Sequence, residues 1–89
     1  MEISEKLKEF GLNNKETDVY LACLELGESS VNEIAIKSNI KRTTIYDILE
    51  SLIKKGLISQ TQRGSKRKFF AEEPEKIKKI IERKGIVII

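Results

Sequence analysis

Two helical patterns joined by a short polar turn occupy residues 30–55, SVNEIAIKSNIKRTTIYDILESLIKK. Ser30 and Glu33 form an expected capping box for the first, short helix. A longer helix is expected over about residues 41–55. Its apolar residues recur at the spacing of one helix face: Ile45, Ile48, Leu49, Leu52 and Ile53. The arrangement is typical of a helix-turn-helix, whose second helix enters the major groove of DNA.

Two further helices are expected before this stretch. The first covers residues 3–10 and the second residues 15–26, with Asn13 and Glu16 as the capping box of the second. Cys23 lies on the apolar face of the second helix. We expect it to be a small buried side chain, because a redox sensor would need exposure and a lowered pKa.

The hydrophobic period changes in the segment that follows. Residues 57–62 and 68–71 are predicted to be short strands, joined by residues 63–66 in a hairpin. The predicted fold class is mainly α with a small β-hairpin, a winged helix-turn-helix. Residues 1–89 are expected to form a single domain, since a chain of this length has room for one core.

Positive charge is concentrated in the middle of the chain. The net charge is +3, but residues 41–68 carry eight Lys or Arg against two acids, a local charge of +6. Residues 1–40 carry −4 and residues 69–89 carry +1. A basic block of this kind indicates a polyanionic partner, and we expect double-stranded DNA.

The start of the 41–55 helix carries basic and polar residues that lie off its apolar stripe. Arginine can donate two hydrogen bonds to guanine, threonine can contact a base edge, and a tyrosine hydroxyl can bond a phosphate. A merely solvated first turn would favour acids at this end, so the basic start favours DNA contact. The candidate DNA contacts here, with the cap of the preceding helix, are Ser30, Lys41, Arg42, Thr43, Thr44, Tyr46 and Asp47.

The tip of the predicted hairpin, residues 63–68, is a second candidate site, which we call the wing. It contributes Arg63, Lys66, Arg67 and Lys68, with no acid before Glu72. A basic hairpin beside a groove-binding helix can follow the phosphate backbone or the minor groove. Alternatively, its lysines protect a strand edge from aggregation, and both readings can hold.

Apolar residues at the two ends of the chain exceed what a three-helix core needs. Residues 74–89 are predicted to form a C-terminal dimerisation helix and an apolar tail. Left exposed, these side chains would form a patch that soluble monomers usually avoid. The alternative is a monomer whose last helix folds back on its own domain. The expected contacts of a two-fold homodimer are Ile3, Leu7, Ile77, Ile80 and Ile81.

Other classes of function find less support. The sequence has no His, one Cys and no Gly-rich phosphate loop, so catalysis, a metal site and a cofactor are not expected. It has no membrane-spanning apolar run and no signal peptide at its start, which predicts a cytoplasmic protein without a membrane partner.

Two alternatives to duplex binding stay open. Winged helices also bind proteins, so a protein–protein interaction module without DNA binding is the main one, and it would show exposed apolar residues in place of the basic block. RNA binding would favour exposed aromatic rings for stacking, and the candidates are Tyr46, Phe69 and Phe70.

Several segments, spread over about residues 5–83, together resemble one known family. The most specific is Arg42-Thr43-Thr44-Ile45-Tyr46, whereas the Leu-x-x-x-Gly-Leu pattern of Leu52, Gly56 and Leu57 occurs in most winged-helix proteins. The others are FGL at 10–12, TDVYLACLEL at 17–26, GESS at 27–30, EIA at 33–35 and AEEP at 71–74. They are similar to the N-terminal domain of archaeal TrmB-type transcriptional regulators. The resemblance implies a winged-helix fold, operator binding as a dimer and control of sugar uptake or metabolism.

The chain departs from the family pattern in two ways. Lys41 stands where the family commonly has proline before the arginine. Full-length members carry a large C-terminal sugar-binding domain, whereas this chain ends at Ile89. Sugar sensing is therefore not carried over, and no small-molecule effector is expected to bind within this chain.

Overall fold

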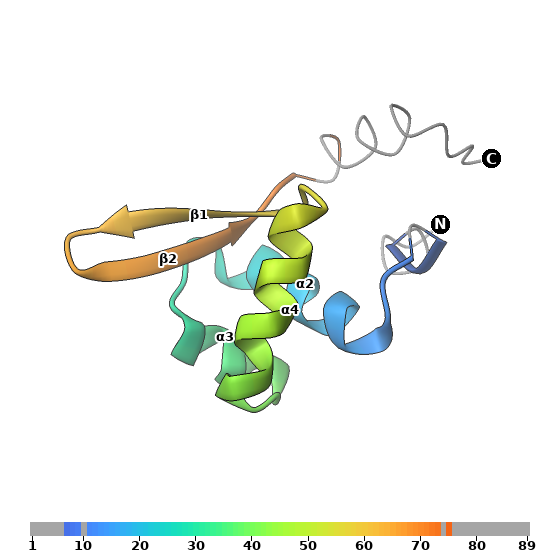
Figure 1. Ribbon diagram of the computed structural model, residues 1–89, viewed down its shortest axis with the longest axis horizontal. Helices are drawn as coiled ribbons and strands as arrows, with labels where there is room; N and C mark the ends of the chain where they lie inside the picture. Colours follow the sequence, from blue (N-terminus) through green and yellow to red (C-terminus); the bar gives the residue numbers. More distant parts are fainter. Residues whose placement is uncertain (1–6, 10, 74, 76–89) are drawn as a thin grey trace.

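The computed structural model describes residues 7–9, 11–73 and 75. Residues 7–9 are helical. The elements that follow are α2 (Asn14–Leu26), α3 (Val31–Ser38), α4 (Arg42–Lys54), β1 (Ile58–Arg63) and β2 (Lys66–Ala71). The helices pack together and the hairpin extends from one side of them (Figure 1). This order confirms a winged helix-turn-helix, mainly α with a small β-hairpin.

Both capping boxes predicted from the sequence are confirmed. The Asn13 side chain accepts a hydrogen bond from the Glu16 N–H at 2.8 Å, and the Glu16 carboxylate accepts one from the Asn13 N–H at 3.1 Å. Ser30 and Glu33 exchange the same two bonds at 3.3 and 3.1 Å. By contrast, the N-cap residue of α4, Lys41, makes no side-chain capping hydrogen bond, and the first turn of α4 has no acid.

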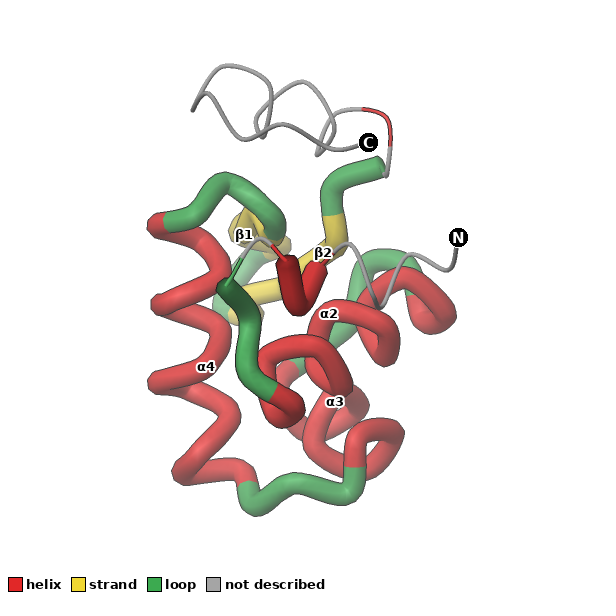
Figure 2. Tube along the Cα trace, turned by 90° about the vertical axis from the view of Figure 1, so that its right-hand side faces the viewer, coloured by secondary structure: helices red, strands yellow, loops and turns green. Residues whose placement is uncertain are grey.

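The turn between α3 and α4 is made possible by Asn39. This residue adopts a left-handed conformation with φ 58°, which asparagine tolerates better than most residues, and it ends α3. The Ile40 N–H then donates to the Ala35 carbonyl at 3.2 Å. Figure 2 shows the result: α4 runs along one edge of the molecule, and α2 and α3 lie beside each other on the opposite side.

The hydrophobic core lies between these helices and the hairpin. Its largest fully buried side chains are Tyr20, Phe69, Leu7, Ile34, Ile45, Leu49, Leu52, Leu57, Ile58, Val19 and Cys23. The presence of Leu7 corrects one expectation. Leu7 was predicted in a dimer interface, but it is 0% exposed because it packs in the core of its own chain. The other predicted interface residues, Ile3, Ile77, Ile80 and Ile81, lie outside the described residues.

The hairpin is longer and its turn shorter than predicted. Arg63 and Lys66 were expected in the connection but pair with each other in the antiparallel register. Gly64, with φ 63°, supplies the left-handed conformation that lets the chain reverse in two residues. Ser29 and Phe69 also exchange backbone hydrogen bonds of 2.9 and 2.8 Å, which tie the hairpin to the loop between α2 and α3. Within the described residues no helix has the length and apolarity to cross a bilayer.

Candidate nucleic-acid interface

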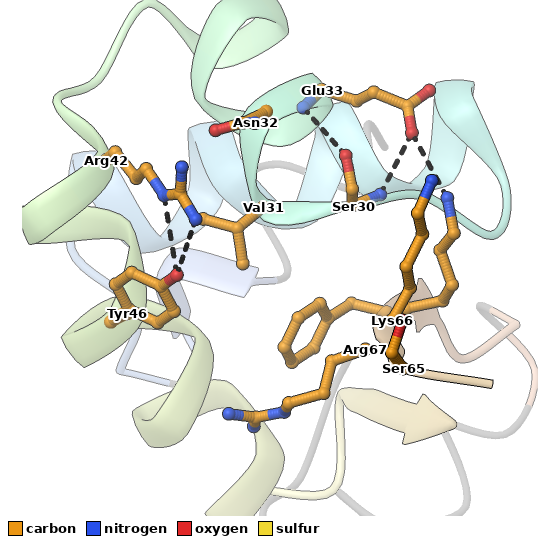
Figure 3. A pocket seen from close by; sticks show the side chains of 11 residues that line it. Ser30, Val31, Asn32, Glu33, Arg42, Tyr46, Ser65, Lys66 and Arg67 are labelled. Carbon is orange, nitrogen blue, oxygen red and sulfur yellow. Dashed lines mark hydrogen bonds and ion pairs between the residues drawn. The ribbon is translucent and has the colours of Figure 1, made fainter. Parts of the chain in front are cut away.

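A groove of about 500 Å³ lies between the starts of α3 and α4 and strand β2 (Figure 3). It brings together six of the predicted DNA contacts, which come from three separate elements: Ser30, Arg42, Tyr46, Lys66, Arg67 and Lys68. The other five predicted contacts, Lys41, Thr43, Thr44, Asp47 and Arg63, do not line it.

The first turns of α4 present their polar side chains to solvent. Lys41, Arg42, Thr43 and Asp47 are exposed, and Thr44 is half-buried. The opposite face of the helix is buried through Ile45, Ile48, Leu49 and Leu52. The apolar stripe therefore turns the basic start of α4 outward, as its spacing predicted. Contact of these residues with DNA stays a prediction.

Tyr46 holds the side chain of Arg42 along the outer face of α4. Arg42 donates to the Tyr46 hydroxyl from Nη2 at 3.1 Å and from Nε at 3.4 Å. Its guanidinium carbon also lies 5.8 Å from the centre of the tyrosine ring. The sequence predicted a direct phosphate contact for this hydroxyl. In the structure it accepts from Arg42, one helical turn away, so it orients the guanidinium (Figure 3).

Arg67 extends from β2 toward α4 (Figure 3). Its guanidinium donates to the Gln60 side-chain oxygen, with Nε at 3.2 Å, and lies 5.2 Å from the centre of the Phe69 ring. These contacts fix its direction without neutralising its charge. Lys66, at the start of β2, is exposed and has no ion pair among the residues that the structure describes.

The other two wing cations have acidic partners that sequence reasoning missed. Arg63 pairs with Glu28 at 3.0 Å, and Lys68 pairs with Glu33 at 3.6 Å. The contact with Glu28 raises the pKa of Arg63. Hydrogen bonds from Ser30, with the charge of Lys68, hold the pKa of Glu33 below its ordinary value. No local signal could have revealed these pairs, because 35 residues separate the partners in each.

A buried acid behind the site fixes the position of α4. Besides capping α2, the Glu16 carboxylate accepts from the Ser51 hydroxyl at 2.8 Å and from the Lys55 ammonium at 3.0 Å. Burial by itself raises the pKa of Glu16. The hydrogen bonds from Asn13, Ser51 and Lys55 together lower it by more, so the pKa lies below its ordinary value. The sequence assigned Glu16 the cap alone. No spacing along the chain could have shown these two contacts, because Ser51 and Lys55 lie 35 and 39 residues from Glu16.

Cys23 is confirmed as a buried side chain, since it is 0% exposed. Burial raises the pKa of its thiol to about 12, which is the opposite of what a reactive cysteine needs. Among the described residues, no cluster of His, Cys, Asp and Glu is suited to hold a metal ion.

Comparison with known proteins gives a consistent family. The family model described as sugar-specific transcriptional regulator TrmB matches residues 7–75. The HTH-type sugar sensing transcriptional regulator TrmBL1 of Pyrococcus furiosus is 39% identical over 74 residues, which cover 83% of this chain and 21% of that protein. This chain therefore spans about a fifth of that archaeal relative's length.

Solved structures agree with the sequence relatives. TrmBL2, an archaeal chromatin protein with a novel mode of DNA binding, superposes with a TM-score of 0.79 at 32% identity, covering 92% of this chain and 32% of its own. A MarR family protein from Bacillus stearothermophilus has a TM-score of 0.69 at 19% identity, covering 91% of this chain and 59% of its own, and so shares the fold. The family model and the Pyrococcus furiosus relative are both described as transcriptional regulators, a class of DNA-associated protein rather than of enzyme, which agrees with the expectation for this chain. Since the family model covers most of its length, the chain belongs to the TrmB family of transcriptional regulators.

Proposed function

We propose that this chain binds double-stranded DNA sequence-specifically, with α4 in the major groove and the wing on the phosphate backbone or in the minor groove. The observation that carries the proposal is the groove itself, into which α3, α4 and β2 bring Ser30, two α4 side chains and three cations of the wing. A regulator that reads genomic DNA would work in the cytoplasm.

The roles of the residues follow from their positions. Arg42, oriented by Tyr46, would donate to a guanine edge, and Thr43 and Thr44 would contact neighbouring base edges. Lys66 and Arg67 would contact phosphates, which position the protein without reading sequence. Lys41, Asp47 and Ser30 flank the groove helix and would complete the contacts with backbone or bases.

The distribution of exposed apolar side chains favours DNA over a protein partner. Among the described residues, the exposed large hydrophobic side chains are Ile36 at 82% and Tyr46 at 42%. Ile36 does not line the groove, and the Tyr46 hydroxyl is engaged by Arg42. RNA stacking finds less support as well, because Phe69 is 1% exposed and Phe70 is half-buried.

Salt dependence of binding tests the proposal. Replacing Lys66 and Arg67 together with glutamine should weaken binding to random and selected duplexes alike. It should also flatten the slope of log K against log salt by about one to two units, at about 0.9 per lost phosphate contact. Fluorescence anisotropy with a labelled duplex over a range of salt concentrations measures this slope.

The matched control replaces Lys8 and Lys15 with glutamine. Both are exposed lysines outside the groove, so the same charge change should leave the slope nearly unchanged. An unchanged slope in the Lys66 and Arg67 variant would show that the wing does not face DNA.

We also propose that the chain acts as a two-fold homodimer through Ile3, Ile77, Ile80 and Ile81. The two α4 helices would then lie about 34 Å apart and match half-sites one DNA turn apart. Ile80→Glu should give a monomer that binds operator more weakly. Light scattering at micromolar concentration decides the question, because a parent mass that stays at 10.2 kDa as concentration rises contradicts the dimer.

A further inference from the structure

Two ion pairs link the wing to the helical body. Arg63 approaches Glu28 with both Nε and Nη2, at 3.2 and 3.0 Å from Oε1, and Nε also lies 3.3 Å from Oε2. Lys68 Nζ lies 3.6 Å from Oε1 of Glu33. Glu28 lies in the loop between α2 and α3, and Glu33 lies in the first turn of α3. Both acids therefore reach the hairpin from the same part of the body.

The hairpin is attached to the body by other contacts besides these pairs. The two backbone hydrogen bonds between Ser29 and Phe69 already attach it, and Phe69 is buried in the core. The side chains of Arg63 and Glu28 are 66% and 37% exposed, and those of Lys68 and Glu33 are 25% and 53% exposed, so both pairs are reached by solvent. Exposed ion pairs contribute little to stability because water and salt screen them. The ion pairs should therefore affect the binding of another anion by the wing cations more than they affect stability.

The availability differs among the four wing cations. Within the described residues, Lys66 and Arg67 have no acidic partner, whereas Arg63 and Lys68 each have one. A phosphate that approaches Arg63 or Lys68 competes with a carboxylate for that cation and is also repelled by it. Two of the four wing cations predicted to bind DNA are thus opposed by charges of the same chain.

We propose that Glu28 and Glu33 limit the phosphate affinity of the wing by competing with DNA for Arg63 and Lys68. The inference rests on the proposed DNA-binding function. The two acids set how strongly the domain binds any duplex, because sequence-independent affinity comes from phosphate contacts. Neither acid lies on α4, but Glu33 lines the same groove as Arg42, so base preference is measured beside affinity in each variant.

Neutral variants of the two acids test this proposal in the full chain. Glu33→Gln is suited to it because glutamine preserves a capping box: its side-chain oxygen can still accept from the Ser30 N–H. Glu28→Gln is the independent second variant. Each should tighten binding to a random-sequence duplex by about 2- to 5-fold, the strength of an exposed ion pair. Each should also steepen the salt slope by about 0.9, one added phosphate contact.

Glu25→Gln is the matched control. It removes one negative charge and breaks an exposed ion pair, Lys37 with Glu25 at 2.8 Å, outside the groove. It should change the affinity less than the two test variants and leave the salt slope unchanged. Thermal melting followed by circular dichroism establishes that every variant is folded at the temperature of the measurement.

The possible outcomes distinguish a failure of this inference from a failure of the DNA-binding proposal. If the parent binds duplex DNA and both variants match Glu25→Gln in affinity and slope, the competition is wrong and the DNA-binding proposal stands. If only one variant tightens binding, the proposal holds for that acid and is overturned for the other. If the parent binds no duplex at all, both proposals fail.

Discussion

Replacing Glu16 with alanine should lower the free energy of unfolding by about 2–4 kcal/mol, below the cost of about 3–5 kcal/mol for a fully buried pair because the Lys55 side chain is 31% exposed. Glu16 is 6% exposed, and its carboxylate serves the cap of α2, Ser51 and Lys55 at once. The substitution leaves the partly buried Lys55 ammonium without its counter-charge. For a domain of this size the melting temperature should fall by about 8–32 °C.

Calorimetry or chemical denaturation measures the loss, and two controls separate its causes. Glu16→Gln keeps the cap and the volume of the side chain but not the charge, so its loss should be intermediate. Glu25→Ala removes an exposed ion pair and should change stability by about 0.5 kcal/mol or less. A Glu16→Ala protein as stable as the parent would show that Glu16 does not fix α4 against α2.

The pKa of the Glu16 carboxylate also predicts how the stability of the protein changes at low pH. Its pKa in the folded chain lies below the ordinary value of 4.5. The stabilisation is therefore fully present above the unfolded pKa and is lost as pH falls through the folded pKa. The difference in stability between the parent and Glu16→Gln should shrink as the pH falls below 4.5.

Replacing Arg42 with alanine should weaken binding to the preferred DNA site by about 1–3 kcal/mol, or about 5- to 150-fold. The loss should be confined to specific sites, with relaxed preference at one base pair. Because Arg42 is exposed and its hydrogen bonds go to the exposed Tyr46, the fold should be unaffected. Anisotropy titrations against the preferred site and single-base variants of it measure both effects.

Arg42→Lys is the matched variant for this prediction. Lysine keeps the positive charge but cannot make the planar pair of hydrogen bonds to guanine. It should keep binding to random duplex near the parental level and lose discrimination at the same base pair. If Arg42→Ala binds the preferred site as tightly as the parent, Arg42 does not read a base.

The local rules of the sequence predicted most of the fold. The capping residues Asn13 and Ser30 and the apolar stripe of the 41–55 helix depend on neighbours within a few residues, and the structure agrees with them. The predicted boundaries of the 15–26 and 41–55 helices differ from those of α2 and α4 by one residue at most. Capping residues lie next to these ends and mark them in the sequence. The second strand was predicted too short because the residues around the turn are all exposed and, apart from Gly64, polar. Their pattern does not show where a strand ends and the turn begins.

The sequence could not predict the tertiary contacts between residues far apart in the chain. Glu16, Glu28 and Glu33 each meet a cation that is 35 or more residues away, so no spacing along the chain announces the contact. Leu7 shows the same limit for burial. An apolar residue near the end of a chain looks equally suited to a partner's surface and to its own core, and only packing distinguishes them. The sequence therefore identified the cations of the candidate site but not the acids that pair with them.

Selection of bound sequences from a pool of random duplex DNA, carried out with the full chain, tests the DNA-binding proposal most directly. We expect enrichment of one motif, arranged as two half-sites whose centres are about one DNA turn apart. The same selection with Arg42→Ala should give a motif with one relaxed position. Recovery of all sequences in proportion to the starting pool, by a protein shown to be folded, would contradict sequence-specific binding by α4.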